Sequence, residues 1–256
     1  MLGPISKKGC ACRNIMSQNI SFNIYCMSYM RPHAIMTKNV FEYCTYVVRA
    51  EEEEAYRKAG VEDILAIPEG KVHDFMSTFY WIIENTPEDV ICIVDDDVKE
   101  MLYRMDYKAP IRTKTGELDQ ERATAECERI AQILYDLNLG LAYDNPQPAP
   151  YVYHQEWQFK AMPGHIRWVN KAAFKAKYNP EDPATSDIDM AMQELLLNRV
   201  ILQPVYYCTQ ATMDTNDGYA EPRSVHESIQ YAMMNKWGQY YDYDFKKNTA
   251  KINVQR

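Results

Sequence analysis

Hydrophobic and polar positions alternate along the first half of the chain in a pattern that predicts four strands separated by helices. Short apolar or β-branched segments, typical of buried strands, end in polar residues and are followed by longer amphipathic segments. The predicted strands are residues 21–28 (SFNIYCMS), 45–50 (TYVVRA), 62–68 (EDILAIP) and 90–94 (VICIV).

The segments between these strands are expected to be helical. Residues 34–43 and 51–60 fill the first two gaps, and the second ends at Gly60, a residue favoured just after a helix. Residues 71–86 fill the third gap, and their apolar positions recur at helical spacing. The apolar face of this third helix consists of Val72, Phe75, Met76, Phe79, Ile82 and Ile83.

The second half of the chain is less regular. Residues 116–140 predict a long helix, residues 144–153 a proline-rich extended segment, and residues 187–199 a shorter helix. Strand-like segments at 165–174 and 201–209 flank the shorter helix. The core side of the long helix is predicted to be Ala125, Ile130, Ile133, Leu134 and Leu137.

Strands that alternate with helices in this way predict βαβ crossovers. We therefore expect an α/β fold whose mainly parallel central sheet carries helices on both faces, with residues 1–256 in a single domain. Ligands of such sheets bind outside the carboxyl ends of the strands. Four polar stretches fall there and form a predicted rim: residues 28–31, 49–51, 68–71 and 95–97.

The composition is that of an acidic protein. The formal net charge is −8 and the pI about 5.2, so any contact with nucleic acid is expected to be local. Seven cysteines, an odd number with no CxxC pair, indicate reduced thiols and a cytoplasmic protein. No apolar run reaches the ~20 residues that span a bilayer, and we expect no membrane segment.

Three consecutive aspartates, Asp95, Asp96 and Asp97, follow the fourth predicted strand. In an extended chain the first and third would point to one side and the second to the other. Mg²⁺ and Mn²⁺ prefer carboxylate oxygens, and three adjacent carboxylates repel one another unless a cation or donor group separates them. A capped, solvated turn is the alternative interpretation.

The sequence contains neither a GxGxxG nor a GxxxxGK[ST] phosphate loop. Phosphate groups of a ligand would therefore have to be held by a metal ion and by cationic side chains. The candidate cations are Arg31, Arg49, Lys71 and Arg223.

A second acidic stretch, TSDIDMAMQELL, begins at Thr185. Ser186 can cap a helix whose first turn holds Asp187 and Asp189, where the helix dipole favours negative charge. Alternatively, Asp187 is a general base that takes a proton from an acceptor hydroxyl. The five histidines share no metal-binding spacing, and His226 is the one that follows an arginine-containing segment late in the chain.

Several of these motifs together resemble the GT-A-fold nucleotide-sugar glycosyltransferases. Among them the chain is most similar to the phage and TET/JBP-associated DNA glycosyltransferases, which attach sugars to hydroxymethylated pyrimidines in DNA. The resemblance covers roughly residues 22–240. Its motifs are Ser28-Tyr29-x-Arg31-Pro32, YVVRAEE, the Ile-Pro end of the third strand, VDDD, HIRWVNKAAF, SDIDMAMQELLLNRVI and TNDGYAEPRS.

The resemblance implies a GT-A-like fold in which about residues 21–110 bind the nucleotide sugar and about residues 111–256 the acceptor. Asp95 and Asp97 would hold Mn²⁺ or Mg²⁺ on the donor diphosphate, with His226 as a further metal ligand. The donor would be a UDP-linked sugar. The residues expected to bind it are Ser28, Tyr29, Arg31, Glu51, Lys71, Asp95, Asp96 and Arg223.

The resemblance also assigns the role of general base to Asp187, although Ser186 stands where many family members have a glutamate. A single glycine, Gly218, stands where they often have two. A single displacement with Asp187 as base would invert the anomeric centre.

The implied acceptor is modified DNA, in the cytoplasm of a phage host. Two basic stretches could contact its phosphates, with lysines at 171, 175 and 177 and with basic residues at 246, 247, 251 and 256. Nearby aromatic residues, Trp237, Tyr240, Tyr241 and Tyr243, could stack on a base or form a packed cluster. The acidic balance favours the alternative of a glycan, lipid or small-molecule acceptor. A nucleotidyltransferase or a silent nucleotide-binding module is the third interpretation.

Overall fold

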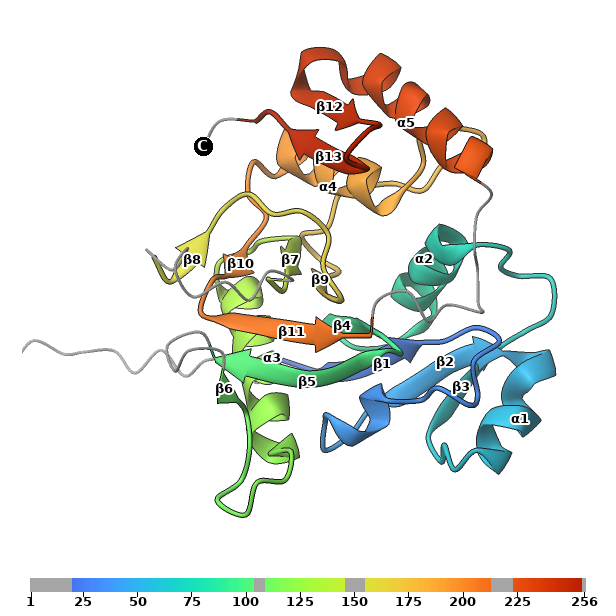
Figure 1. The fold of residues 1–256 in the computed structure, drawn as a ribbon, viewed down its shortest axis with the longest axis vertical. Coiled ribbons are helices and arrows are strands. Elements are labelled where there is room, and N and C mark those ends of the chain that lie inside the picture. Colours follow the sequence, from blue (N-terminus) through green and yellow to red (C-terminus); the bar gives the residue numbers. More distant parts are fainter. Residues whose placement is uncertain (1–19, 104–108, 146–154, 213–222, 255–256) are drawn as a thin grey trace, which may run out of the picture.

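The structure is a computed structural model of the whole chain, and it describes residues 20–103, 109–145, 155–212 and 223–254. Among these residues six strands form a central sheet in the order β3-β2-β1-β4-β9-β7 (Figure 1). The strands are β1 (Phe22–Met27), β2 (Thr45–Arg49), β3 (Ile64–Ile67), β4 (Val90–Asp95), β7 (Leu141–Tyr143) and β9 (Ile166–Asn170).

The sheet is mainly parallel, as the sequence predicts. β1 pairs in parallel with both β2 and β4, and β2 pairs in parallel with β3. β9 then runs antiparallel to β4, and β7 antiparallel to β9. The four strands predicted from the first half of the chain therefore all have their carboxyl ends at one edge.

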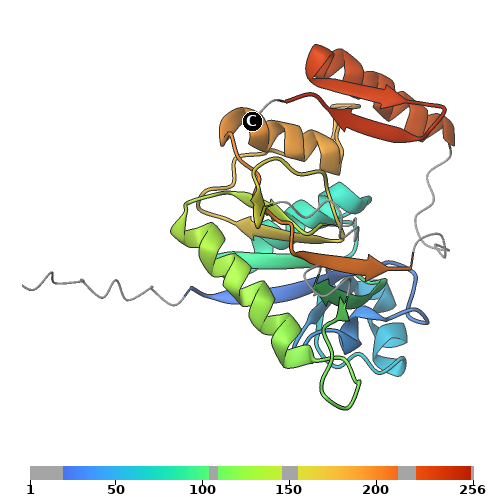
Figure 2. The ribbon, with the colours of Figure 1, turned by 60° about the vertical axis from the view of Figure 1, so that its left-hand side comes forward.

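Helices cover both faces of the sheet, which explains why β4 is apolar at every position before Asp95. Ile91 and Ile93 pack in one cluster with α2 (Phe75–Asn85) and α4 (Asp187–Leu197). Val90, Cys92 and Val94 pack in another cluster with α3 (Gln120–Asp136). Figure 2 shows α3 and α4 on different sides of the sheet.

The helices α1 (Glu53–Lys58) and α2 are confirmed with shorter bounds than predicted. A 3₁₀ turn, η2 (Ala50–Glu52), precedes α1, and Gly60 just beyond it has the positive φ of 86° that suits a residue after a helix. Asp74 caps α2: its Oδ1 accepts a hydrogen bond from the Ser77 N–H at 2.6 Å.

The long helix is confirmed as α3, but its predicted core side is only partly right. Ile130 and Leu134 are buried, whereas Ala125 is exposed and Leu137 is 57% exposed. The buried face instead continues through Ala123, Thr124, Cys127 and Ala131. The helix is thus rotated toward these small residues, which allow it to approach β4 and β9 closely.

The prediction of a helix over residues 34–43 is wrong. This segment contains only the 3₁₀ turn η1 (Thr37–Asn39). The backbone N–H groups of Met36 and Thr37 both donate to the carbonyl oxygen of Asp96, at 3.2 and 3.3 Å, and Thr37 Oγ1 donates to that of Asp95 at 2.6 Å. These long-range bonds replace helical ones, so the segment supports the loop after β4.

Smaller sheets and a C-terminal unit complete the described chain. The predicted strand at 201–209 is divided into two, and most of the proline-rich segment 144–153 lies outside the described residues. The elements are β5 (Val98–Tyr103), β6 (Ala109–Pro110), β8 (Trp157–Gln158), β10 (Gln203–Pro204), β11 (Tyr207–Ala211), α5 (Arg223–Trp237), η5 (Gly238–Tyr240), β12 (Tyr241–Asp244) and β13 (Thr249–Ile252).

The C-terminal unit consists of α5 and the β12–β13 hairpin, and it lies beside α4 (Figures 1 and 2). Among the described residues, no helix has the length and apolar character that a membrane crossing requires.

Candidate functional site

A pocket of about 270 Å³ lies at the carboxyl ends of the parallel strands, near the lower end of the range for small-molecule sites. Its walls come from the ends of β1, β2, β3 and β4 and from the start of α2. The lining residues are Met27, Ser28, Tyr29, Arg31, Val47, Val48, Arg49, Ile67, His73, Asp74, Phe75, Thr78, Asp95, Asp96 and Asp97.

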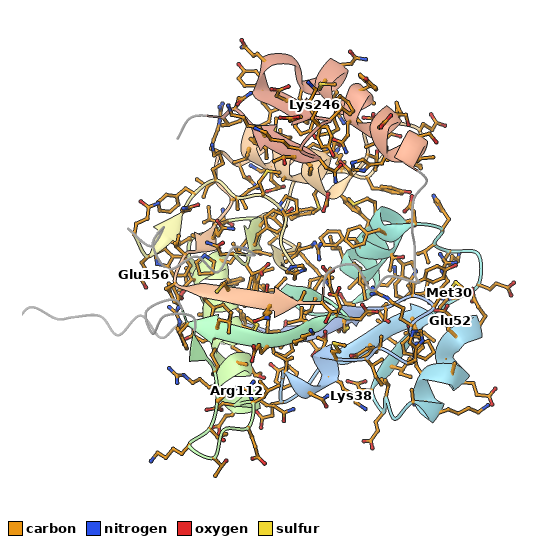
Figure 3. The ribbon with its side chains drawn as sticks, viewed as in Figure 1. Met30, Lys38, Glu52, Arg112, Glu156 and Lys246 are labelled. Carbon is orange, nitrogen blue, oxygen red and sulfur yellow. The ribbon has the colours of Figure 1, made fainter. Side chains whose placement is uncertain are left out.

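Three of the four predicted rim stretches reach this pocket, whereas none of residues 68–71 lines it and neither does Glu51. The side chains of Glu51 and Lys71 are exposed, because Glu51 lies on the outer side of η2 and Lys71 in the turn after β3. The neighbouring Glu52 turns inward instead, and its Oε1 accepts a hydrogen bond from the Met30 N–H at 3.0 Å. Figure 3 shows Met30 and Glu52 close together at this edge of the molecule.

Asp96 is fully buried and is bound by residues from β1 and the following loop. Arg31 Nη2 lies 2.6 Å from its Oδ1, and Ser28 Oγ donates a hydrogen bond to its Oδ2. The Tyr56 hydroxyl in turn lies 2.6 Å from Ser28 Oγ. Burial raises the pKa of Asp96 to about 6, although Ser28 and Arg31 both act to lower it. The second aspartate is therefore held by the protein itself.

Asp95 points to the opposite side, toward β9. Arg167 Nη1 donates to its Oδ1 at 2.8 Å, and Nδ1 of His165 lies 3.5 Å from its Oδ2. Burial acts to raise the pKa of Asp95, but the charges and hydrogen bonds of Arg167 and His165 outweigh burial and lower it. The predicted division of the aspartates between two sides is thus observed for Asp95 and Asp96.

Asp97 is the least satisfied of the three. Within the described residues its buried Oδ1 has no hydrogen-bond partner, and burial together with the charge of Asp95 raises its pKa. Ligand atoms of Asp95, Asp97 and His165 all lie within 4.8 Å of one another. Carboxylate oxygens with one imidazole nitrogen form a donor set that fits a divalent cation such as Mn²⁺ or Mg²⁺.

The predicted metal ligand His226 is not part of this group. It lies on α5, where its Nε2 is 2.8 Å from the Tyr243 hydroxyl and its ring packs edge-on against that of Tyr243. His165 stands in the group instead, because the antiparallel pairing of β9 places its carbonyl oxygen 3.0 Å from the Asp95 N–H. The only signal in the sequence was its position at the start of a predicted strand.

Gly164 explains how His165 reaches this place. A Cβ atom at residue 164 would lie 2.1 Å from Oδ1 of Asp144, an impossible contact. Asp144 is itself buried, and the same Oδ1 accepts a hydrogen bond from the Ile166 N–H at 2.8 Å. The absence of a side chain at 164 therefore lets the chain pass Asp144, the residue after β7, just before β9 begins.

Asp187 is the first residue of α4, and both interpretations of its stretch agree with the structure. Ser186 caps the helix, since its Oγ accepts a hydrogen bond from the Asp189 N–H at 3.1 Å. Burial raises the pKa of Asp187, while the charge of Arg167 acts against burial. Asp187 does not line the pocket, but Arg167 interacts electrostatically with both Asp187 and Asp95. The charge of Arg167 thus acts on both carboxylates.

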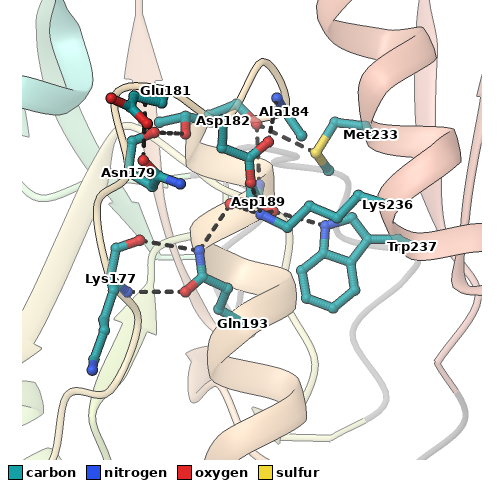
Figure 4. A network of polar contacts seen from close by, with 12 residues as sticks. Lys177, Asn179, Glu181, Asp182, Ala184, Asp189, Gln193, Met233, Lys236 and Trp237 are labelled. Carbon is teal, nitrogen blue, oxygen red and sulfur yellow. Dashed lines mark hydrogen bonds and ion pairs between the residues drawn. The ribbon is translucent and has the colours of Figure 1, made fainter.

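Asp189, two residues further on, is bound within a polar cluster between α4 and α5 (Figure 4). Lys236 Nζ lies 2.8 Å from its Oδ1, and Trp237 Nε1 donates to the same oxygen at 2.8 Å. Gln193 Nε2 donates to its Oδ2 at 2.8 Å. This Asp189 cluster attaches the C-terminal unit to α4.

Lys171 and Lys246, one from each basic stretch proposed to contact DNA, lie away from the pocket. Asn170 pairs with Val90 in the sheet, so Lys171 follows at the amino end of β4, where its Nζ donates to Thr86 Oγ1 at 2.6 Å. Lys246 lies in the turn of the C-terminal hairpin, well separated from Met30 in Figure 3.

Most of the aromatic residues near the C-terminal basic stretch form a packed cluster, which was the alternative to stacking on a base. Tyr241 and Tyr243 are 3% and 8% exposed and belong to the core, and Trp237 packs against it, while Tyr240 is 50% exposed. Arg223 begins α5, but its side chain lies outside the described part of the chain, as does Gly218.

Comparison with known proteins shows the fold. No model of a protein family and no curated protein sequence matches the chain. Solved structures do match. A mannosyltransferase from Pyrobaculum calidifontis, in complex with GDP-Man and Mn²⁺, has a TM-score of 0.51 at 11% identity, over 87% of this chain and 71% of that one.

Two further structures agree. Glucosyl-3-phosphoglycerate synthase from Mycobacterium tuberculosis has a TM-score of 0.51 at 7% identity, over 92% of this chain and 88% of that one. A mycobacterial protein has a TM-score of 0.53 at 7% identity, over 91% of this chain and 83% of that one. At these identities the likeness concerns the fold. The predicted α/β class is confirmed: the chain has the GT-A-like fold of these glycosyltransferases.

Proposed function

We propose that the protein is a metal-dependent glycosyltransferase that moves a sugar from a nucleoside diphosphate sugar to an acceptor hydroxyl. The observation that carries this proposal is the convergence of Asp95, Asp97 and His165 beside the pocket at the carboxyl ends of the parallel strands. The fold supports it, since one protein of the same fold was solved with GDP-Man and Mn²⁺ and another is a glucosyl-3-phosphoglycerate synthase.

The pocket suits a negatively charged donor whose phosphates approach the aspartates. Arg49 lies over the ring of Tyr29, 4.0 Å from its centroid, and Arg31 is held by Asp96. These two guanidinium groups are preorganised, so they lose little conformational freedom when they meet phosphate oxygens. We assign the nucleoside to the side of Ser28 and Tyr29 and the diphosphate to the side of Asp95 and Asp97.

Glycosyl transfer breaks the bond between the anomeric carbon and a diphosphate oxygen and forms a bond from that carbon to the acceptor oxygen. A divalent cation, when bound, neutralises the charge that develops on the departing diphosphate. Asp187 accepts the proton of the acceptor hydroxyl. Its raised pKa makes it a stronger base than an exposed aspartate.

Arg167 interacts with both the proposed metal ligand Asp95 and the proposed base Asp187. It is 4% exposed, donates a hydrogen bond to Asp95 and interacts electrostatically with Asp187. We therefore assign it the role of a positioning residue: it fixes the carboxylate of Asp95 and limits the rise in the pKa of Asp187.

The experiment that tests the proposal incubates the purified protein with Mn²⁺ or Mg²⁺ and a panel of UDP- and GDP-linked sugars. We expect the wild-type protein to release nucleoside diphosphate. The Asp97→Asn variant, measured alongside, should release less. Release of pyrophosphate would instead indicate nucleotidyl transfer. A folded protein that neither binds nor cleaves any donor would contradict the proposal.

The acceptor that the sequence resemblance predicts is a hydroxymethylated pyrimidine in DNA, and the predicted donor is a UDP-linked sugar. We propose to test both by the mass gain of hydroxymethylcytosine-containing DNA, with unmodified DNA as the matched control. The acidic charge and the remote position of Lys171 and Lys246 favour a small acceptor. Transfer to free saccharides or other small hydroxyl compounds but not to DNA would support that alternative.

A further inference from the structure

We infer that His165 is the third protein ligand of the cation and that its imidazole makes the site prefer Mn²⁺ to Mg²⁺. The inference rests on the proposed function for the presence of a cation, and it adds the identity of that cation. It concerns a residue that enters the site only through the pairing of β9 with β4.

The geometry of the three side chains fits one ion. In octahedral coordination at about 2.1 Å, two ligand atoms lie about 3.0 Å apart when adjacent and about 4.2 Å when opposite. Nδ1 of His165 lies 3.5 Å from Oδ2 of Asp95, and the ligand atoms of all three residues lie within 4.8 Å of one another. Shifts of a fraction of an ångström would bring them onto one cation.

The other contacts of these carboxylates leave one oxygen of each for the ion. Oδ1 of Asp95 accepts the hydrogen bond of Arg167, so Oδ2, which faces His165, is the oxygen on the metal side. Oδ1 of Asp97 is buried without a hydrogen-bond partner in the described part of the chain. Coordination of the cation by that oxygen would give it a partner.

An imidazole ligand changes the selectivity of such a site. Mg²⁺ prefers oxygen donors and retains its water molecules, whereas transition-metal ions, including Mn²⁺, also accept imidazole nitrogen. Two aspartates alone would suit either ion. The addition of His165 therefore shifts the preference toward Mn²⁺, and its removal is expected to weaken Mn²⁺ binding more than Mg²⁺ binding.

His226 is the rival ligand, and its contacts argue against it. Its Nε2 lies 2.8 Å from the Tyr243 hydroxyl, which is also 2.6 Å from Oδ1 of Asn248 in the hairpin. These contacts hold His226 at the junction of α5 and the hairpin. The two histidines can be separated by experiment, because only one of them should couple magnetically to bound Mn²⁺.

The test measures Mn²⁺ binding directly, by electron paramagnetic resonance on the purified full chain, with UDP present and absent, and Mg²⁺ binding by competition. The expected wild-type result is Mn²⁺ affinity at least about 10-fold above Mg²⁺ affinity, with a ¹⁴N coupling to the bound ion. In His165→Asn and His165→Gln we expect that coupling to disappear and Mn²⁺ affinity to fall about 10-fold, with Mg²⁺ affinity within about 3-fold.

Two histidine variants serve as controls. His33→Asn changes an exposed histidine that does not line the pocket, and His226→Asn changes the rival. Both should keep the wild-type coupling. Circular dichroism confirms that each variant is folded.

The inference would be overturned if the ¹⁴N coupling persisted in folded His165 variants or disappeared in His226→Asn. It would also be overturned if the His165 variants bound Mn²⁺ and Mg²⁺ equally more weakly than the wild type. Each of these results would leave the glycosyltransferase proposal intact. Failure of the wild-type protein to bind either ion, with or without UDP, would overturn both.

Discussion

Two acidic stretches of this chain, Asp95–Asp97 and Asp187–Asp189, look alike in sequence, and the fold divides each of them in the same way. In each stretch the protein binds every aspartate but one, and Asp95 of the first stretch accepts from Arg167. Asp96 accepts from Ser28 and Arg31, and Asp189 accepts from Gln193, Lys236 and Trp237. Asp97 and Asp187 remain, and burial raises the pKa of both.

The comparison distinguishes carboxylates that stabilise the local structure from carboxylates that take part in the proposed chemistry. A buried carboxylate with a full set of donors stabilises the local structure through its hydrogen bonds. A carboxylate that is buried but poorly satisfied has a high free energy in its charged form, which a cation or a proton lowers. We therefore expect substitutions of Asp96 or Asp189 to affect stability first, and substitutions of Asp97 or Asp187 to affect activity first.

The largest expected effect is that of Asp97→Asn. Removal of one metal ligand should lower sugar transfer about 1000-fold, because the charge on the leaving diphosphate is no longer neutralised. The melting temperature should stay the same or rise, since the repulsion between Asp95 and Asp97 is removed. Transfer assays at saturating Mn²⁺, with thermal unfolding alongside, check both; a large loss of stability would break the comparison.

Asp187→Asn is expected to reduce kcat about 100- to 1000-fold with little change in KM for the donor, because an amide cannot accept the acceptor's proton. Asp242→Asn, at an exposed position on the hairpin, is the matched control and should behave as the wild type. Steady-state kinetics at several pH values measure the effect. If kcat stayed within about 3-fold of wild type, another base would have to be sought.

Asp189→Ala should lower the free energy of unfolding by about 3 kcal/mol, because it leaves Trp237 Nε1 without its acceptor and Lys236 with Asp182 alone. Urea denaturation measures this loss. Asp187→Ala is the comparison, and it should cost less than about 1 kcal/mol since Arg167 keeps its ion pair with Asp95. Equal losses in the two variants would mean that the two carboxylates do not differ in this way.

The acid limb of the pH–rate profile should report Asp187. The group must be ionised to accept a proton, so its raised pKa places the loss of activity at a higher pH than the ordinary aspartate value of about 3.9. Arg167→Met removes a charge that lowers this pKa and should move the limb upward by about one pH unit, whereas Arg167→Lys should leave it in place. An unchanged limb in Arg167→Met would remove Arg167 from this role.

The smallest expected effect is at the edge of the Asp189 cluster. Asp182 also accepts from Lys236, at 2.6 Å, but the two side chains are 23% and 30% exposed. Asp182→Asn should cost only about 0.5 kcal/mol. The hydrogen bond from Lys236 lowers the pKa of Asp182, so this contribution is present above the ordinary pKa and is lost as pH falls. The difference in unfolding free energy between wild type and variant should therefore be smaller at pH 3 than at pH 7.

Much of the fold could be predicted from local patterns. The four parallel strands and the helix α2 follow from periodicity over a few residues, because side chains at positions i and i+2 or i and i+4 share a face. The helix expected over 34–43 failed for the complementary reason: the backbone of Met36 and Thr37 bonds to Asp96, far away in the chain.

The sequence by itself determined the mainly parallel sheet and placed Asp95, Asp96 and Asp97 at its carboxyl edge. Only the tertiary structure decided which partners they meet. The antiparallel pairing of β9 brings His165 and Arg167 to Asp95, and the loop after β1 brings Ser28 and Arg31 to Asp96. The physical reason is that periodicity specifies which face a residue occupies, whereas long-range packing and hydrogen bonding select the residues that face each other across it.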